Sequence, residues 1–333
     1  MTALEAARRP RAVFLDRDGT LIREKGYLKD PKQVELEHGA ARAASALKRS
    51  GFRVVVVTNQ SGVARGFYTE RDVLAVHQEI ARLLGLAGAS ADGFYYCPHH
   101  PRGELEPYRM ECSCRKPGTG LLETAVQELG LSMAGSYLVG DKRTDMEAAR
   151  RAGLTGILVL TGFGRDEWSA CLRGAGPGSP DRVARDLSEA ADWILWHEGE
   201  ILGRTSGLYE QRGWSSKWVS LRLLAERASI HRSRGENIVV KCAYTAIYDN
   251  LQEVSTRLTR EPGEVLVAAI TDDRRTPGSP CDPSRARLPM EQRIEVLSRL
   301  PSVDYVVTAE LEDVQTAIRS DSRVHAIEGA GVS

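Results

Sequence analysis

The chain has 333 residues, more than one ordinary domain needs, so two domains are the natural expectation. Lysine plus arginine and aspartate plus glutamate number 45 each, and this balance argues against a global field that would attract nucleic acid or an anionic membrane. No apolar run is long enough to span a bilayer, and residues 1–14 lack a signal-peptide core. We therefore expect a cytoplasmic protein that binds neither membranes nor nucleic acid.

The first half of the chain alternates between strand-like and helix-like patterns. Apolar runs predict strands at 12–15, 53–57, 93–96, 136–139 and 156–160. Helical spacing of apolar residues lies between them, at about 39–50, 69–85, 118–130 and 144–153, and again at 181–196. Such alternation predicts an α/β fold with a Rossmann-like parallel sheet, covered by helices on both faces, that binds ligands beyond the carboxyl ends of its strands. The last helix would close this domain near residue 197.

The first predicted strand ends in two aspartates, Asp16 and Asp18, followed by Gly19. Alternate residues of a strand point to the same face, so the two carboxylates can converge just past its end. Carboxylates that close repel each other unless a cation or a proton lies between them, and Mg²⁺ prefers oxygen ligands. The motif suggests phosphoryl chemistry, although taken alone it is also explained by an acidic turn with Gly19 at positive φ.

Three further motifs follow in order along the chain. Thr58-Asn59-Gln60-Ser61 comes after the second strand, Arg115-Lys116-Pro117 precedes a helix, and Asp141-Lys142 comes after the fourth strand. Together the four motifs resemble the haloacid dehalogenase superfamily of aspartate-nucleophile phosphohydrolases. The resemblance implies that Asp16 is the nucleophile and Asp18 the general acid/base, that Thr58 binds phosphoryl oxygens, and that Lys116 neutralises the charge near the nucleophile. It implies a Mg²⁺ site at Asp16, Asp18 and Asp141.

The segment 97–117 carries a second metal-binding pattern. Cys97, His99, Cys112 and Cys114 form a Cys-x-His and a Cys-x-Cys pair, a plausible Cys₃His set for structural Zn²⁺. His100 is an adjacent competitor that the residues themselves do not exclude, and three reduced cysteines in a surface loop are the alternative explanation. Resemblance to a family loop of the form CxH…CxC favours His99. The other three cysteines are scattered, as suits a reducing compartment.

With this loop, residues 11–165 resemble the bacterial D-glycero-D-manno-heptose-1,7-bisphosphate phosphatases and their relatives, the histidinol-phosphate phosphatases. The resemblance implies removal of the 7-phosphate from the phosphorylated sugar, with histidinol phosphate as the alternative substrate. It also implies substrate contacts from six residues, Asn59, Gln60, Ser61, Arg65, Arg115 and Lys142. Arginine suits a remote phosphate because its planar fork binds two oxygens, although each basic residue is also explained as a solvated surface charge.

The C-terminal part predicts a helical linker over 198–234 and a second, smaller α/β domain over 235–333. Strands are expected at 237–243, 265–270 and 303–307, with helices ending near residues 258 and 300. This domain resembles the cytidylyltransferase-like nucleotidyltransferases. Tyr248-Asp249-Asn250-Leu251 stands where that family carries its HxGH motif, so we expect a degenerate domain that has lost its chemistry. The remaining roles are a homodimer interface, a scaffold or a lid, and the alternative is a bifunctional or remnant sugar nucleotidyltransferase. The fusion favours heptose over histidinol phosphate.

Overall fold

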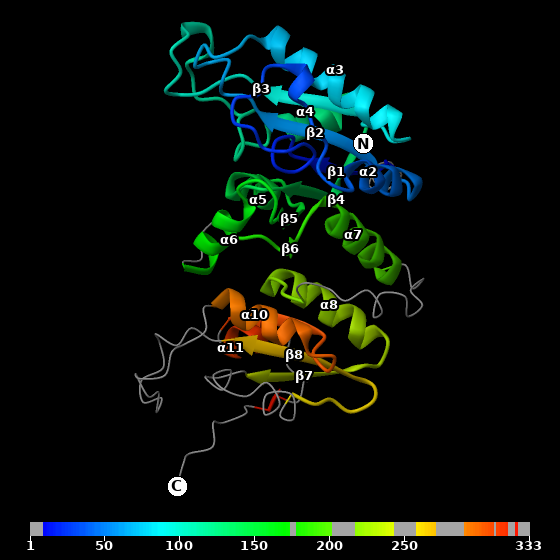
Figure 1. Ribbon diagram of the computed structural model, residues 1–333. Helices are drawn as coiled ribbons and strands as arrows, with labels where there is room; N and C mark the ends of the chain where they lie inside the picture. Colours follow the sequence, from blue (N-terminus) through cyan, green and yellow to red (C-terminus); the bar gives the residue numbers. More distant parts are fainter. Residues whose placement is uncertain are drawn as a thin grey trace. The chain divides into compact units, whose positions relative to one another are not determined.

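The computed structural model describes residues 9–173, 178–201, 217–242, 258–270, 290–309, 311–318 and 324–325. The chain forms two compact units, Met1–Arg204 and Thr205–Ser333, and Figure 1 labels their helices and strands. Within the described residues, every helix is too short or too polar to span a lipid bilayer.

The first unit is built on a six-stranded sheet in the order β3-β2-β1-β4-β5-β6, in which every neighbouring pair is parallel. The strands are β1 (Arg11–Leu15), β2 (Arg53–Asn59), β3 (Gly93–Cys97), β4 (Ser132–Gly140), β5 (Thr155–Val159) and β6 (Arg182–Ala184). In the central register, Leu15 lies beside Val56 on one side and Val139 on the other. The segments that follow β1, β2 and β4 therefore meet at one edge of the sheet.

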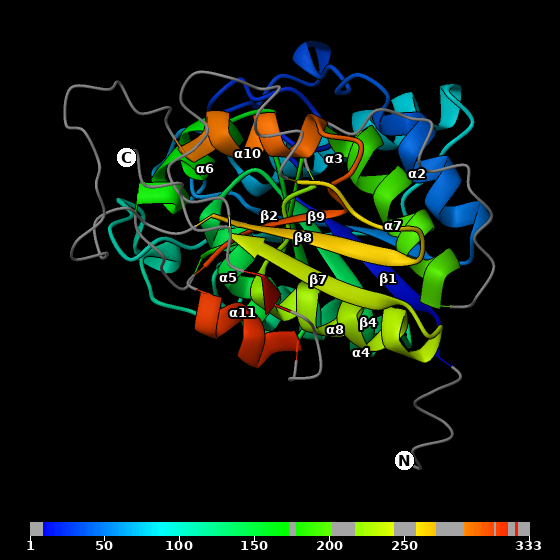
Figure 2. The same cartoon turned by 90° about the horizontal axis from the view of Figure 1, so that it is seen from below.

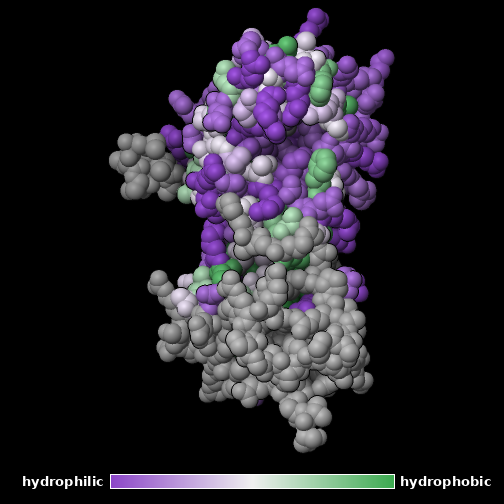
Figure 3. Space-filling view, turned by 90° about the vertical axis from the view of Figure 1, so that its left-hand side faces the viewer, coloured by the Kyte–Doolittle hydropathy of each residue, from purple (hydrophilic) through white to green (hydrophobic). Residues whose placement is uncertain are grey.

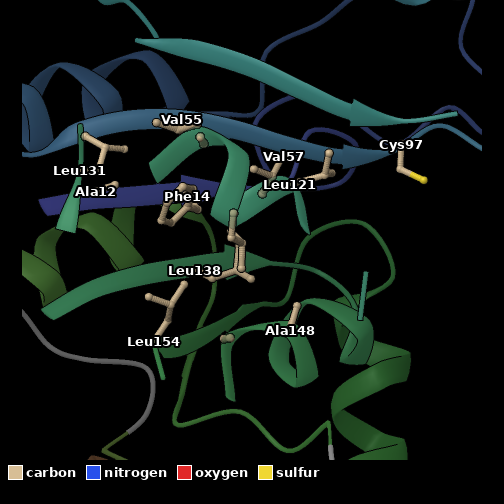
Figure 4. Close-up of a cluster of buried hydrophobic side chains, with 13 residues drawn as sticks. Ala12, Phe14, Val55, Val57, Cys97, Leu121, Leu131, Leu138, Ala148 and Leu154 are labelled. Carbon is tan, nitrogen blue, oxygen red and sulfur yellow. The ribbon is translucent and has the colours of Figure 1, made fainter. Parts of the chain in front are cut away.

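Helices cover both faces of this sheet. They are α2 (Ala40–Arg49), α3 (Glu70–Leu86), α4 (Gly120–Glu128), α5 (Arg143–Arg151), α6 (Gly164–Arg173) and α7 (Leu187–Ile201), with short 3₁₀ turns η1 (Pro31–Gln33) and η2 (Glu106–Tyr108). On one face, Leu122 of α4 and Ala148 of α5 join Phe14 and Leu138 in a buried cluster (Figure 4). On the opposite face, His77 of α3 stacks on Phe94, with ring centroids 5.1 Å apart.

Local signals explain where α3 begins and which face it buries. Thr69 caps the helix, because its side chain accepts from the Asp72 amide while the Asp72 carboxylate accepts from the Thr69 amide. Val73, Val76, Ile80 and Leu84 follow at helical spacing and are all buried. The helix thus lies on the sheet with one apolar stripe, as its sequence predicts.

The structure corrects the single helix predicted over 181–196. Residues 182–184 instead form β6, in which Val183 pairs with Leu158 of β5, and α7 begins only at Leu187. Val183 and Ala184 are buried at the edge of the sheet, so pairing with β5 overrides the helical spacing. Helix α6 was not predicted from the sequence.

The second unit contains a smaller parallel sheet in the order β10-β7-β8-β9. Its elements are α8 (Leu221–Ser233), β7 (Asn237–Cys242), β8 (Glu264–Ile270), α10 (Met290–Arg299), β9 (Tyr305–Thr308), α11 (Leu311–Ile318) and β10 (Val324–His325). In Figure 2, α10 lies on one side of this sheet, and α8 and α11 lie on the other. A second α/β unit was predicted, and its likeness to nucleotidyltransferases stays a prediction.

The sequence predicts a linker over 198–234, whereas the two units of the structure divide after Arg204. Helix α8 is part of the second unit, since Leu223 and Leu224 are buried and the preceding Val219 amide donates to the Val306 carbonyl at 2.9 Å. Its apolar residues thus serve a domain core. Residues 243–257, which include the degenerate motif at Tyr248–Leu251, lie outside the described residues.

Candidate active site

Three carboxylates meet at the carboxyl edge of the first sheet. Asp16 follows β1, Asp141 follows β4 and Asp145 lies in the first turn of α5, and one oxygen from each lies within 4.8 Å of the others. All three side chains are buried. The parallel register explains the meeting of Asp16 and Asp141, while Asp145 is brought there by the helix that follows Asp141.

Two glycines make room for the Asp141 carboxylate. A Cβ atom at Gly19 or at Gly162 would lie 2.2 Å from Asp141 Oδ2, and both residues have positive φ. The Phe163 amide also donates to Asp141 Oδ2 at 2.9 Å. The loops after β1 and β5 therefore approach so closely that only glycine fits at these two positions.

Lys116 joins two of the carboxylates. Its buried Nζ lies 2.7 Å from Asp16 Oδ1 and 2.6 Å from Asp145 Oδ1, and it donates to the Val57 carbonyl at 2.8 Å. Asn59 fixes the lysine backbone with two hydrogen bonds of 3.0 Å, since its amide donates to the Lys116 carbonyl and accepts from the Lys116 amide. Asn59 was predicted to contact substrate, and here its side chain holds the segment that carries Lys116.

The charges of this cluster are unequally stabilised. Burial raises the pKa of Asp141 to about 8, and the neighbouring Asp16 charge adds to the rise. Burial would also raise the pKa of Asp16, but the Lys116 and Lys142 ammonium groups hold it below its ordinary value. For Lys116, burial would lower the pKa, yet Asp145 and Asp16 raise it above its ordinary value. Lysine therefore stabilises Asp16 as an anion, whereas burial favours the protonated form of Asp141 even with Lys142 Nζ 3.3 Å away.

The cluster fits a divalent cation. Three ionised carboxylates with the ammonium groups of Lys116 and Lys142 would leave one net negative charge, and a cation bound there would favour the ionised form of Asp141, which burial disfavours. Oxygen-only ligands beside a cavity are the donor set that Mg²⁺ takes, with positions left for water and phosphate.

Asp18, predicted as a further metal ligand, lies outside this carboxylate cluster. Arg17 grips its carboxylate with two bonds, from Nε to Oδ2 at 3.0 Å and from Nη2 to Oδ1 at 3.1 Å. Gln60 Nε2 donates to Asp18 Oδ2 and to Thr58 Oγ1, both at 2.9 Å. The pairing with Arg17 and Gln60 thus uses the Asp18 carboxylate as a hydrogen-bond acceptor. Gln60, predicted to contact substrate, also uses its amide for hydrogen bonds within the protein.

A cavity of about 380 Å³ opens onto the cluster, a size typical of small-molecule sites. Among the predicted site residues, it is lined by Asp16, Asp18, Thr58, Asn59, Gln60, Ser61, Arg115, Lys116 and Lys142. Arg65 is not among the described lining residues, and its Nη2 instead lies 3.3 Å from His100 Nε2. The face of the first unit in Figure 3 is mostly hydrophilic, with isolated apolar side chains.

The Cys/His loop brings its four predicted residues together. Cys97 Sγ lies 3.5 Å from Cys112 Sγ and 3.2 Å from Cys114 Sγ, and His99 Nδ1 lies 3.7 Å from Cys97 Sγ. A tetrahedral zinc ion with Zn–S bonds of about 2.3 Å separates its sulfur ligands by roughly 3.8 Å, so the set fits zinc. His100 points elsewhere, because its Nδ1 accepts from the Arg102 amide at 3.0 Å.

Two tyrosines tie this loop to the sheet. Glu70, the first residue of α3, accepts from Tyr96 Oη at 2.6 Å and from Tyr108 Oη at 2.7 Å. Tyr96 belongs to β3 and Tyr108 to η2 inside the loop. Arg115 leaves the same loop and donates to the His99 carbonyl at 3.3 Å, so the loop carries a cationic side chain to the cavity wall.

Sequence reasoning missed several residues of the site. Asp145 received no role, although its place four residues after Asp141 in a helix start could have placed it on the same side. Glu24, Tyr27 and Phe163 line the cavity as well, from loops that carry no motif. Tyr68, also in the lining, follows the second motif by only a few residues and gave no signal of its contact with Gln60.

Several known proteins are similar to this chain in sequence. A family model described as HAD-hydrolase-like matches residues 113–190. The D-glycero-beta-D-manno-heptose-1,7-bisphosphate 7-phosphatase of Salmonella typhi is 41% identical over 185 residues, which cover 55% of this chain and 89% of the relative. Its counterpart from Yersinia pestis is 45% identical over the same shares of both chains.

A solved structure matches the same share of the chain. It is the D,D-heptose 1,7-bisphosphate phosphatase from B. bronchiseptica complexed with magnesium and phosphate, at 32% identity and a TM-score of 0.49, and the match covers 56% of this chain and 99% of that one. By its sequence relatives, this chain is a phosphatase that belongs to the haloacid dehalogenase-like family of D-glycero-D-manno-heptose-1,7-bisphosphate 7-phosphatases.

Proposed function

We propose that this phosphatase removes the 7-phosphate of D-glycero-D-manno-heptose 1,7-bisphosphate through a phosphoryl intermediate on Asp16. The observation that carries the proposal is the buried Asp16 carboxylate, held 2.7 Å from Lys116 at the edge where β1, β2 and β4 end. The heptose substrate is supported by relatives that are named for it and of which this chain covers 89%.

In the first half-reaction, Asp16 attacks phosphorus while the bond to the sugar oxygen breaks. Asp18 gives its proton to that leaving oxygen, so the sugar departs as a neutral alcohol. Lys116 keeps Asp16 ionised, because its ammonium is fixed by Asp145 and the Val57 carbonyl as well. Thr58 Oγ1 accepts from Gln60, so its own hydrogen is free to donate to a phosphoryl oxygen.

In the second half-reaction, water attacks phosphorus and the bond to Asp16 breaks. Asp18 now takes a proton from the water, which restores its starting form and releases phosphate. Lys116 again stabilises Asp16 as it leaves as a carboxylate.

Asp16 and Asp141, with Asp145 beside them, are the residues that would hold Mg²⁺. When bound, Mg²⁺ would supply positive charge that offsets the negative charge developing on the phosphoryl group. We also propose that Cys97, His99, Cys112 and Cys114 hold a structural Zn²⁺. That site closes on four protein ligands and leaves no position for chemistry.

Substrate recognition falls to the cationic side of the cavity. Arg115 and Lys142 line it from different segments, and Lys142 Nζ lies 4.6 Å from the Phe163 ring centroid and 3.5 Å from Glu24. A sugar with a second phosphate supplies the anion that Arg115 can grip with two bonds. A monophosphate lacks that anchor, so the bisphosphate is the better ligand.

The test is phosphate release from both anomers of heptose 1,7-bisphosphate, measured beside histidinol phosphate, with and without Mg²⁺. We expect fastest turnover of the β-anomer, loss of turnover with a chelator, and none in Asp16→Asn. Asp192→Asn is the matched control, since Asp192 pairs with Arg42 and does not line the cavity. Faster turnover of histidinol phosphate would overturn the substrate assignment, and an active Asp16→Asn variant would overturn the mechanism.

A further inference from the structure

A buried chain of hydrogen bonds runs from Tyr68 to the predicted general acid/base. Tyr68 Oη lies 2.7 Å from Gln60 Oε1, and the amide nitrogen of the same Gln60 lies 2.9 Å from both Asp18 Oδ2 and Thr58 Oγ1. Gln60 is 2% exposed and Tyr68 is 7% exposed. Water therefore has little access to either partner of this chain.

The chemistry of the groups fixes the direction of each bond. Asp18 Oδ2 accepts from Arg17 Nε and the acid proton is placed on Oδ1, so the NH₂ end of Gln60 faces Oδ2. The carbonyl end then faces Tyr68, whose hydroxyl must donate. Burial raises the pKa of Tyr68 to about 12, so the hydroxyl keeps its hydrogen across the working range of the enzyme. The Tyr68 hydroxyl thus stabilises the orientation in which the NH₂ end of Gln60 faces Asp18.

Packing holds the tyrosine ring in this position. Tyr68 lies in a small buried cluster with Val63 and Val73. A Cβ atom at Gly62 would lie 2.3 Å from the Tyr68 ring. The glycine after Ser61 therefore provides the space in which the ring reaches Gln60.

The same bonds leave one position open on Asp18. Oδ2 accepts from Arg17 Nε and from Gln60, whereas Oδ1 accepts from Arg17 Nη2. Oδ1 thus has one fewer hydrogen bond than Oδ2 and keeps a lone pair for the transferred proton. Without the Gln60 donor, the carboxylate would be positioned by the two bonds from Arg17 alone.

We propose that Tyr68 is a positioning residue for catalysis: by holding the Gln60 amide, its hydroxyl orients the Asp18 carboxylate for proton transfer. This inference rests on the proposed function, because it gives Asp18 the role stated there. Tyr68 acts through Gln60 and takes no part in bond making.

The test compares Tyr68→Phe with the wild type on two leaving groups. We expect kcat for the sugar phosphate to fall about tenfold, the worth of one hydrogen bond that orients a proton donor, with KM within twofold. With 4-nitrophenyl phosphate, whose leaving group needs no proton, the first-turnover release of 4-nitrophenolate should stay within twofold. Tyr95→Phe is the control, since it removes a tyrosine hydroxyl that donates to Glu128 at 3.0 Å.

Three outcomes would overturn the proposal. A rise in KM with unchanged kcat would make Tyr68 a substrate contact. Equal slowing of kcat for the sugar phosphate and of the first release of 4-nitrophenolate would make its role structural. Unchanged kinetics on both substrates would remove any role.

A measurement that needs no activity separates this inference from the proposed function. Tyr68→Phe should lower the urea midpoint at least twice as much in the wild type as in a Gln60→Leu background, and equal shifts would contradict the hydrogen bond. If the wild type turns over neither substrate, the proposed function fails. The comparison of urea midpoints then decides alone whether Tyr68 positions Gln60.

Discussion

The Nζ atom of Lys116 lies 2.7 Å from Oδ1 of Asp16, although the two residues are 100 positions apart in the chain. Both side chains are buried, and the same ammonium also faces Asp145 at 2.6 Å. Because these charged groups are buried, water cannot readily take the place of a partner that is removed. The pair therefore links the stability of the fold to the reactivity of the site.

Lys116→Met should lower both the stability of the fold and the activity of the site. It leaves two carboxylates buried without their cation, which we expect to cost about 3–5 kcal/mol of unfolding free energy, and phosphate release should fall by roughly 10²–10³. Urea denaturation and a phosphate assay measure the two effects. Lys48→Met is the control, because Lys48 meets Asp92 at 3.0 Å with part of its side chain in water, and its loss should cost under about 1 kcal/mol. Equal costs would contradict the role of burial.

Gly162→Ala should weaken Mg²⁺ binding and lower activity together. Its Cβ would lie 2.2 Å from Asp141 Oδ2, so the carboxylate must move. Gly153→Ala is the matched control, since Gly153 has a similar positive φ of 71° but nothing within 4 Å of its Cβ. Both variants share a backbone strain of about 1–2 kcal/mol, and titration of activity with Mg²⁺ should separate them. A normal Mg²⁺ titration in Gly162→Ala would contradict the close approach.

Metal analysis should find about one zinc per chain, and Cys112→Ser should lose it. The three thiols and His99 form one set, so removal of any sulfur leaves an incomplete site. Cys171→Ser should retain the zinc, because Cys171 lies in α6 and contacts the Gly178 carbonyl instead. Zinc that remains bound in Cys112→Ser, or a protein that never contains it, would contradict the assignment.

Stability should decline in mild acid because of His77. Burial lowers the pKa of this histidine from 6.5 to about 3, with the Arg17 charge adding to the effect. Between these two pKa values the unfolded chain binds a proton that the folded chain does not bind. The free energy of unfolding therefore falls as pH drops below 6.5, by up to about 1.4 kcal/mol per pH unit.

Urea midpoints of the wild type and His77→Phe at pH 7.5, 6.5 and 5.5 measure this effect. Phenylalanine can keep the stack on Phe94, which has ring centroids 5.1 Å apart, and it cannot titrate. The difference between the two proteins removes the contribution of all other groups. Parallel pH dependences would show that His77 accepts its proton in the folded state.

The strand ends were predictable because parallel strands bring their carboxyl ends to one edge. Asp16, Thr58 and Asp141 each follow an apolar run, and β1, β2 and β4 are neighbours in the sheet. β6 was not predictable from spacing alone. Its three residues fit a helix pattern as well, and only the free edge of β5 decides for a strand.

Side-chain direction within the motifs was harder to predict. His99 and His100 are adjacent and chemically identical, so the loop path alone decides which one meets the thiols. Gln60 and Asn59 sit in a motif that suggests ligand contacts, yet Tyr68 and Lys116 engage their amides. Such partners depend on tertiary packing, which no local pattern encodes.

Asp145 answers to two demands at once. Its Oδ2 receives the Lys142 amide at the start of α5, and its Oδ1 faces the Lys116 ammonium. Asparagine would preserve the first and lose the second, whereas glutamate adds a methylene that the buried space beside Gly140 does not offer. The position therefore tolerates few other residues. A substitution there alters the start of α5 and the reactive centre at the same time.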